Sequence, residues 1–158
     1  MTSKPAAIIA TVLMALTACG TLDDEQSQFV TMPDHGWRYN DTLSFVPLAA
    51  DSTGPSEVTG RIVIAVRHSA AYRYSNLWVE LSYNREGDSV PARDTANIVL
   101  ADVYGRWLGH GAGVSYVVTD TLPRRYSVRD SASLSLRHIM RLDTVADIEQ
   151  VGLIFIPD

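Results

Sequence analysis

The stretch Arg61-Ile62-Val63-Ile64-Ala65-Val66-Arg67 decides the fold class of this chain. Its branched apolar side chains at positions 62, 64 and 66 share one face, and a second stretch, Leu77-Trp78-Val79-Glu80-Leu81-Ser82-Tyr83, alternates in the same way. Successive side chains of a β-strand point to opposite faces, so both stretches are predicted to be strands that bury one face. If the two strands pair around the intervening loop, Arg67 lies on the same outward face as Trp78 and Glu80 and can stack on one or pair with the other.

Shorter segments with the same character follow along the rest of the chain. Leu43 and Phe45 alternate with polar neighbours, and further strands are predicted at residues 98–100, 114–119, 134–140 and 151–156. The last of these is apolar on both faces, which predicts a central strand, and residues 143–150 are expected to form one helical turn before it. Short strands separated by turn residues are typical of an all-β, antiparallel β-sandwich, of which the jelly roll is one form.

The N-terminal residues have the pattern of a lipoprotein signal peptide. Lys4 precedes an apolar run from Ala6 to Leu16, which is shorter than the roughly 20 residues that a transmembrane helix needs. The run ends in Leu16-Thr17-Ala18-Cys19, which resembles a lipobox, and Cys19 is the only cysteine of the chain. We therefore expect residues 1–18 to be cleaved off and Cys19 to be lipidated, which anchors the mature protein to a lipid bilayer and leaves it no free thiol.

The part that follows Cys19 has the size of one domain. Residues 19–28, with Asp23-Asp24-Glu25, are expected to form the lipidated cysteine and a flexible tether, and residues 29–158 a single β-sandwich domain. Once Lys4 is removed with the signal, twelve arginines remain against eighteen acidic residues, a net charge of −6. A negative surface repels phosphate backbones, so no nucleic acid is expected as a partner.

No pattern of catalytic or metal-binding residues emerges from the sequence. The four histidines are scattered without metal-ligand spacing and there is no Gly-x-Ser-x-Gly motif, so we expect no enzymatic activity, no metal and no cofactor. His138 shares a predicted strand face with Leu134 and Leu136 and is expected to be a hydrogen-bonded core residue. The glycines at positions 105, 109, 111 and 113 precede a strand rather than a helix, so tight turns or a bulge explain them better than a phosphate loop.

Two loops carry the candidate partner-binding residues. Tyr72, Arg73, Tyr74 and Asn76 lie between the two best-patterned strands, and Trp107 lies beside the glycines. Aromatic and arginine side chains are enriched at binding surfaces. Asn76 is expected to close its loop by bonding local backbone. The alternative to a binding surface is that both tyrosines fold inward as a cap and that Trp107 plugs the end of the sandwich.

Three segments of the chain carry a family resemblance. They are Val66-Arg67-His68 with Tyr72-Arg73-Tyr74-Ser75-Asn76-Leu77-Trp78, Leu100-Ala101-Asp102 with Gly105-Arg106-Trp107-Leu108-Gly109-His110-Gly111, and Met140-Arg141 with Val151-Gly152-Leu153. In their order and spacing, and together with residues 37–45 and the lipobox, they resemble the gliding-motility lipoprotein H family (GldH) of the Bacteroidota. Two positions depart from that pattern, because the family often has a proline where Arg73 stands and an acidic residue where Gln150 stands.

The resemblance implies a non-enzymatic accessory component of the gliding motility and type IX secretion machinery. Its partners are then other gliding motility or secretion proteins, and its place is the cell envelope, lipid-anchored in the outer membrane, on the periplasmic or the surface face. The alternative is a glycan-binding surface lipoprotein, because jelly rolls often bind glycans. Surface aromatics on a concave face would favour a glycan, and a flat apolar patch would favour a protein partner.

Overall fold

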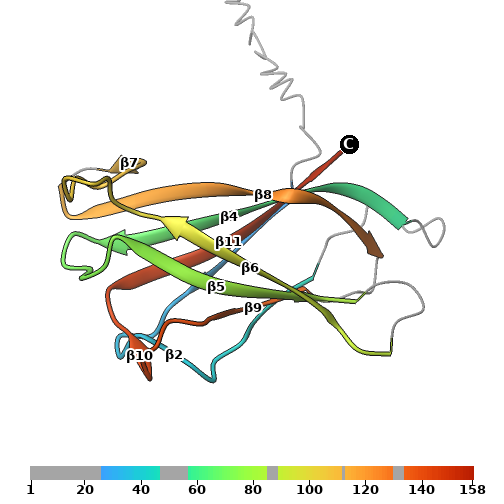
Figure 1. Cartoon of the computed structure of the whole chain (residues 1–158), viewed down its shortest axis with the longest axis horizontal. Helices are drawn as coiled ribbons and strands as arrows, with labels where there is room; N and C mark the ends of the chain where they lie inside the picture. Colours follow the sequence, from blue (N-terminus) through green and yellow to red (C-terminus); the bar gives the residue numbers. More distant parts are fainter. Residues whose placement is uncertain (1–25, 47–56, 85–88, 112, 130–133) are drawn as a thin grey trace, which may run out of the picture.

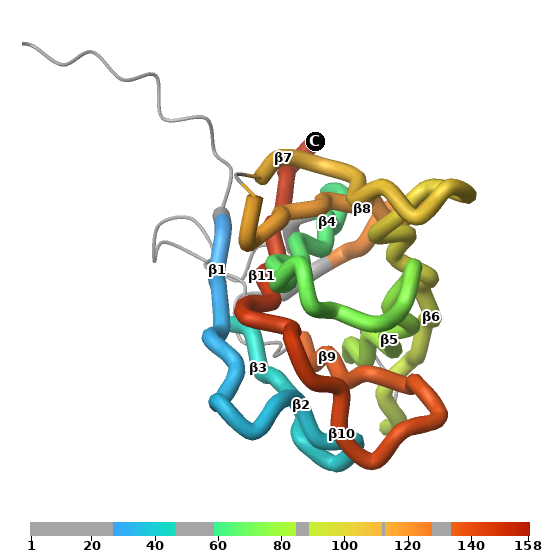
Figure 2. Tube along the Cα trace, turned by 90° about the vertical axis from the view of Figure 1, so that its left-hand side faces the viewer, coloured from blue at the N-terminus to red at the C-terminus, as the bar shows by residue number. Residues whose placement is uncertain are grey.

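Two antiparallel sheets face each other across a single core (Figure 1, Figure 2). The computed structural model describes residues 26–46, 57–84, 89–111, 113–129 and 134–158, and these contain no helix. The five-stranded sheet, called sheet A, has the order β1 (Gln26–Thr31), β11 (Ile148–Pro157), β4 (Glu57–Ser69), β8 (Ser115–Arg129) and β7 (His110–Gly111). The four-stranded sheet, called sheet C, has the order β3 (Leu43–Phe45), β9 (Leu134–His138), β5 (Asn76–Tyr83) and β6 (Ala92–Val99). The predicted all-β sandwich is confirmed.

The core lies between the two sheets and is built from the faces that alternation predicts. Strand β4 buries Ile62, Ile64 and Val66, and β5 buries the apolar side chains at positions 77, 79, 81 and 83. Strand β11 lies between β1 and β4, so its predicted central position is also correct. Its outer face is covered in part by Phe29, whose ring lies where a side chain on Gly152 would be. Because both faces of β11 are then packed, its apolar pattern has a direct physical reason.

The helical turn predicted for residues 143–150 is wrong. Residues Thr144–Val145 form the short strand β10, which pairs with β2 (Trp37–Arg38), and β11 already begins at Ile148. Between them Asp147 has a φ of 65°, which a right-handed helix does not allow. Burial of Val145 beside Trp37 therefore outweighs the local tendency toward a turn of helix.

The expected pairing of the strands 61–67 and 77–83 is also wrong. Strand β4 belongs to sheet A and β5 to sheet C, and residues 70–75 cross from one sheet to the other. Arg67 and Trp78 consequently lie on opposite outer faces of the sandwich. Glu80 instead accepts a hydrogen bond from Arg137 Nε at 2.9 Å, across the β5–β9 pair. The loop is longer than a hairpin turn because it spans the thickness of the core, about 10 Å, from one sheet to the other.

The two long sides of the sandwich differ in how they are closed. On the side of β1 and β3, the amide of Gln28 binds both backbone groups of Val46. On the side of β6 and β8, one carboxylate oxygen of Asp94 accepts hydrogen bonds from the hydroxyls of Tyr83 and Tyr126, each at 3.1 Å. Burial and the nearby Asp94 raise the pKa of Tyr126, so its hydroxyl stays protonated and can donate. A single polar cluster therefore joins the sheets on this side.

Strand β1 begins part-way along the sandwich. Its first residue, Gln26, lies three residues before the predicted start of the domain at residue 29, and it pairs with Phe155, which pairs with Ile62 near the middle of β4. One end of the sandwich, here called the distal end, carries the crossing loop 70–75 and the segment 100–111 (Figure 1). No helix in the described residues is long and apolar enough to cross a membrane.

Candidate functional site

The distal end is closed by a cluster of aromatic rings around His68. His68 continues the inward face of β4 and is fully buried, with its ring centroid 4.5 Å from that of Trp107 and 5.7 Å from that of Tyr72. The Tyr116 ring stacks on that of His68 at 5.8 Å and lies 6.1 Å from that of Trp107. The Nδ1 atom of His68 lies 2.9 Å from the Ser69 carbonyl oxygen, whereas Nε2 has no hydrogen-bond partner among the described residues. These rings pack the end of the core.

The two tyrosines of the crossing loop differ in burial. Tyr72 is only 4% exposed, and its hydroxyl donates to the Asn76 carbonyl at 3.0 Å. Burial raises the pKa of the Tyr72 hydroxyl, with a smaller effect of Tyr74 in the same direction. Tyr74 is 38% exposed and contacts Tyr72 edge-on at 5.6 Å, while Arg73 points to solvent. Tyr72 thus has the position of a cap, and Arg73 and Tyr74 remain accessible.

Asn76 and Trp107 also have defined places. The Asn76 amide nitrogen donates to the Asn97 side-chain oxygen at 2.6 Å, across the β5–β6 pair, so the expected bond to local backbone is not made. Trp107 is half-buried against the core and pairs with Ala101 in an isolated β-bridge. Trp107 therefore closes the base of the loop that follows β6 and plugs the end of the sandwich, although part of its ring stays exposed.

The loop 102–106, called the tip loop, projects beyond this cluster. One carboxylate oxygen of Asp102 accepts the N–H groups of Tyr104 and Arg106 at 2.9 Å, and its other oxygen accepts Arg106 Nε at 2.7 Å. These bonds, led by the backbone N–H of Arg106, hold the pKa of Asp102 below its usual range. Gly105 supplies a φ of 79° for the turn. Three hydrogen bonds to the Asp102 carboxylate therefore fix the loop.

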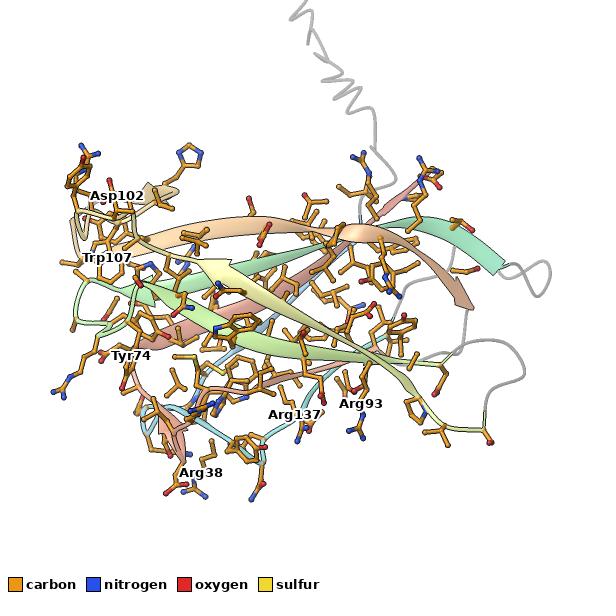
Figure 3. The ribbon with its side chains drawn as sticks, viewed as in Figure 1. Arg38, Tyr74, Arg93, Asp102, Trp107 and Arg137 are labelled. Atoms are coloured by element: carbon orange, nitrogen blue, oxygen red, sulfur yellow. The ribbon has the colours of Figure 1, made fainter. Side chains whose placement is uncertain are left out.

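The fixed tip loop holds two apolar side chains out in solvent. Val103 is 93% exposed and Tyr104 is 82% exposed, with the Arg106 guanidinium 5.6 Å from the Tyr104 ring centroid. Figure 3 shows Asp102, Trp107 and Tyr74 together at this end of the sandwich. Neither Val103 nor Asp102 is among the binding residues predicted from the sequence. An Asp followed three residues later by Gly is a turn signal, and it could have drawn attention to both.

The glycines after the tip loop serve close packing of the backbone. A side chain on Gly109 would lie 2.0 Å from the Val117 carbonyl oxygen, and its φ is 77°. The segment then pairs with β8 as β7. The predicted use of these glycines in turns beside a strand is thus correct.

The remaining predicted residues lie apart from the distal end or outside the described part. His138 is fully buried on β9, where burial lowers its pKa, partly offset by the nearby backbone of Trp37 and Arg38. Neither of its ring nitrogens makes a well-formed hydrogen bond, which differs from the expectation of a hydrogen-bonded core histidine. Within the described residues, no group of three or more His, Cys, Asp or Glu could hold a metal ion. Cys19 and the lipobox lie outside the described residues.

Comparison with known proteins identifies the family. A family model described as GldH lipoprotein matches residues 25–154, which includes every described strand except parts of β11. The chain belongs to the GldH lipoprotein family. The resemblance seen in the three segments is thereby confirmed. As a GldH protein it is a gliding-motility lipoprotein of the cell envelope, anchored to a membrane.

Other comparisons add little to this assignment. No curated protein matches the GldH chain. Among solved structures, Cocksfoot mottle virus is 14% identical over 100% of this chain and 95% of that chain, with a TM-score of 0.30. The infectious bursal disease virus VP2 subviral particle is 12% identical over 97% of this chain and 38% of that chain, with a TM-score of 0.27. TM-scores this low support no argument about the fold or function of GldH.

Proposed function

We propose that this GldH chain is a non-enzymatic accessory component of the gliding motility and type IX secretion machinery that binds a protein partner through its distal end. The binding surface consists of Val103 and Tyr104 on the tip loop, with Arg73, Tyr74 and the exposed part of Trp107 beside them. The chain is anchored to the outer membrane through acylated Cys19, on the periplasmic or the surface face.

The exposure of Val103 and Tyr104 on a loop fixed by Asp102 is the observation that carries this proposal. Exposed apolar side chains that no packing requires point to a binding function. A fixed loop loses little conformational entropy when it binds, so its side chains can contribute more of their contact energy to affinity. The tip loop also lies away from Gln26, where β1 begins beside the middle of β4.

A glycan is the less favoured partner. Two pockets lie between β6 and β8, and neither is lined by tryptophan, the side chain on which sugars stack best. The single tyrosine in them, Tyr126, has its hydroxyl bonded to Asp94. The apolar side chains of the tip loop project outward instead of lining a hollow, which suits a protein surface.

The test replaces both exposed residues of the tip loop in the full lipidated chain, as Val103→Asp with Tyr104→Asp, in a strain that lacks the native copy. Two new charges at a desolvated contact should release the chain from its complex, while its folding and membrane attachment stay unchanged. The readouts are co-purification with gliding and secretion proteins after crosslinking, cell movement, and export of type IX substrates.

A matched control is Val90→Asp, because Val90 is also largely exposed but precedes β6 at the end remote from the tip loop. It should leave all three readouts at the level of the unchanged chain. Normal complex formation by the tip-loop double variant would refute the distal surface. Unimpaired movement and export in a strain without the chain would refute the role in the machinery.

A further inference from the structure

The outer edge of β6 is the longest regular strand edge that the described sheets leave unpaired. Its eight residues, Ala92–Val99, pair in unbroken register with β5 on one side, and no described strand pairs with the other. The strand contains no proline and no bulge. Natural proteins usually protect such edges with proline, bulges or lysine, because an open edge is a template for another strand. An unprotected edge of this length therefore needs an explanation.

The direction of the free backbone groups follows from two hydrogen bonds. Leu100 N–H donates to the Ser75 carbonyl at 2.8 Å, and Ile139 N–H donates to the Trp78 carbonyl at 2.9 Å. In an antiparallel ladder the residues that face a given partner alternate. These bonds thus direct the even-numbered residues of β6 toward β5. The odd-numbered residues direct their N–H and C=O groups away from the sheet; they are Arg93, Thr95, Asn97 and Val99.

The other edges of the two sheets are shorter or interrupted. Strand β8 is paired by β7 as far as Val117, and farther along Pro123 removes a donor within a bulge of β8, where residues 122–124 lie opposite Ile62 of β4. The β1 edge carries the Gln28–Val46 bonds, and β3 has only three residues. Protection of the other edges makes the open edge of β6 a specific feature of this fold.

Two pockets lie along the same side of the sandwich, between β6 and β8. One, of about 320 Å³, has Leu81, Ala96 and Leu122 among its lining residues, with Arg93 and Arg124 at its rim. The other, of about 410 Å³, is nearer the distal end and is lined in part by Val99 and Asp120. A strand added to β6 would place alternate side chains toward these pockets. Arg93 and Arg124 are paired with Glu80 at 4.0 Å and Asp94 at 3.5 Å, and both are largely exposed, so an acidic side chain of the added strand can join these pairs.

We infer that the open edge of β6 receives an extended peptide segment of a partner protein, which adds to sheet C as a fifth strand. The peptide pairs with the four outward-directed residues of β6, places apolar side chains at alternate positions over the pockets, and carries an acidic residue near Arg93 and Arg124. Main-chain hydrogen bonds supply affinity and the pockets supply selectivity, as in other cases of strand addition. This inference rests on the proposed function only in treating the chain as an interaction protein.

The test selects ligands from a displayed library of random decapeptides on the purified full chain, and measures selected synthetic peptides against variants. Thr95→Pro removes an outward donor without touching the β5 ladder, and should weaken binding about tenfold or more. Thr95→Ala is the matched control, because it removes the same side chain but keeps the N–H, and should change affinity less than about threefold. If Thr95→Pro does not fold, the same peptide with alternate backbone amides methylated must lose binding to the unchanged chain.

Hydrogen exchange supplies an independent readout of the site. Without peptide, the amides of Thr95 and Asn97 should exchange faster than those of Ala96 and Ile98, and the selected peptide should slow the exchange of the first pair. Equal binding to the Thr95→Pro variant, tolerance of backbone methylation, or no peptide enriched above background would overturn the inference. Protection of Thr95 and Asn97 that rises with chain concentration in the absence of peptide would assign the edge to a second copy instead, and would also overturn it. None of these results depends on whether the distal end binds gliding proteins, so the two proposals can fail separately.

Discussion

Replacement of Tyr72 by alanine should destabilise the domain far more than the same change at Tyr74, only two residues away. Tyr72 is 4% exposed, so truncation removes about 150 Å² of buried ring surface from the core, or about 4 kcal/mol at 25 cal/mol per Å². This agrees with the range of about 3–5 kcal/mol measured for large aromatic truncations. Tyr72→Phe keeps the ring and loses only the hydrogen bond to the Asn76 carbonyl, which should cost about 1 kcal/mol.

Urea unfolding of the soluble domain, followed by tryptophan fluorescence, measures these differences, and a thermal melt should show a loss of about 12 °C or more for Tyr72→Ala. Tyr74→Ala serves as the matched control and should cost less than half as much, because Tyr74 is 38% exposed. Arg73→Glu should stay within about 0.5 kcal/mol of the unchanged domain. A cost below about 1 kcal/mol for Tyr72→Ala, or equal costs at the two tyrosines, would contradict the assignment of Tyr72 as the cap.

Three further predictions concern other parts of the chain. Folding lowers the pKa of His138, so as the pH falls the unfolded state binds a proton at this residue before the folded state does. The free energy of unfolding should therefore decrease as the pH drops below about 6.5. His138→Leu, which has a similar volume and no titratable group, should lose less stability between pH 7 and pH 5 than the unchanged chain. An equal shift of the urea midpoint in the variant and the unchanged chain would contradict this prediction. Gly109→Ala should destabilise more than Gly105→Ala, because both have positive φ but only the first places a side chain against the Val117 carbonyl; equal melting temperatures would disprove this. Cys19→Ala should abolish incorporation of labelled fatty acid, and a labelled variant would refute lipidation at that residue.

The sequence by itself determined the strands with the clearest alternation and the face that each of them turns to the core. In β5 the buried Leu77, Val79 and Leu81 alternate with less buried neighbours, and this period of two is a property of adjacent residues that needs no knowledge of the fold. The family could also be identified from the sequence, because the order and spacing of several short segments are characteristic of it although no single motif is. The glycines around β7 were assigned to turns for the same local reason.

Only the tertiary structure decided which strands pair and which side chains remain accessible. Strands β4 and β5 follow each other in the chain yet belong to different sheets, so the separation of Arg67 from Trp78 could not be read from their alternation. Tyr72 and Tyr74 have the same residue type in one loop, but only Tyr72 reaches the aromatic rings beside His68. Thr144 and Val145 form a strand because they pair with β2, about a hundred positions away in the sequence, and residues 148–150 form one because they pair with β4 and β1. Strand pairing and burial depend on which distant segments compete for the same backbone groups and the same core volume. A local sequence pattern does not determine which of these segments pair.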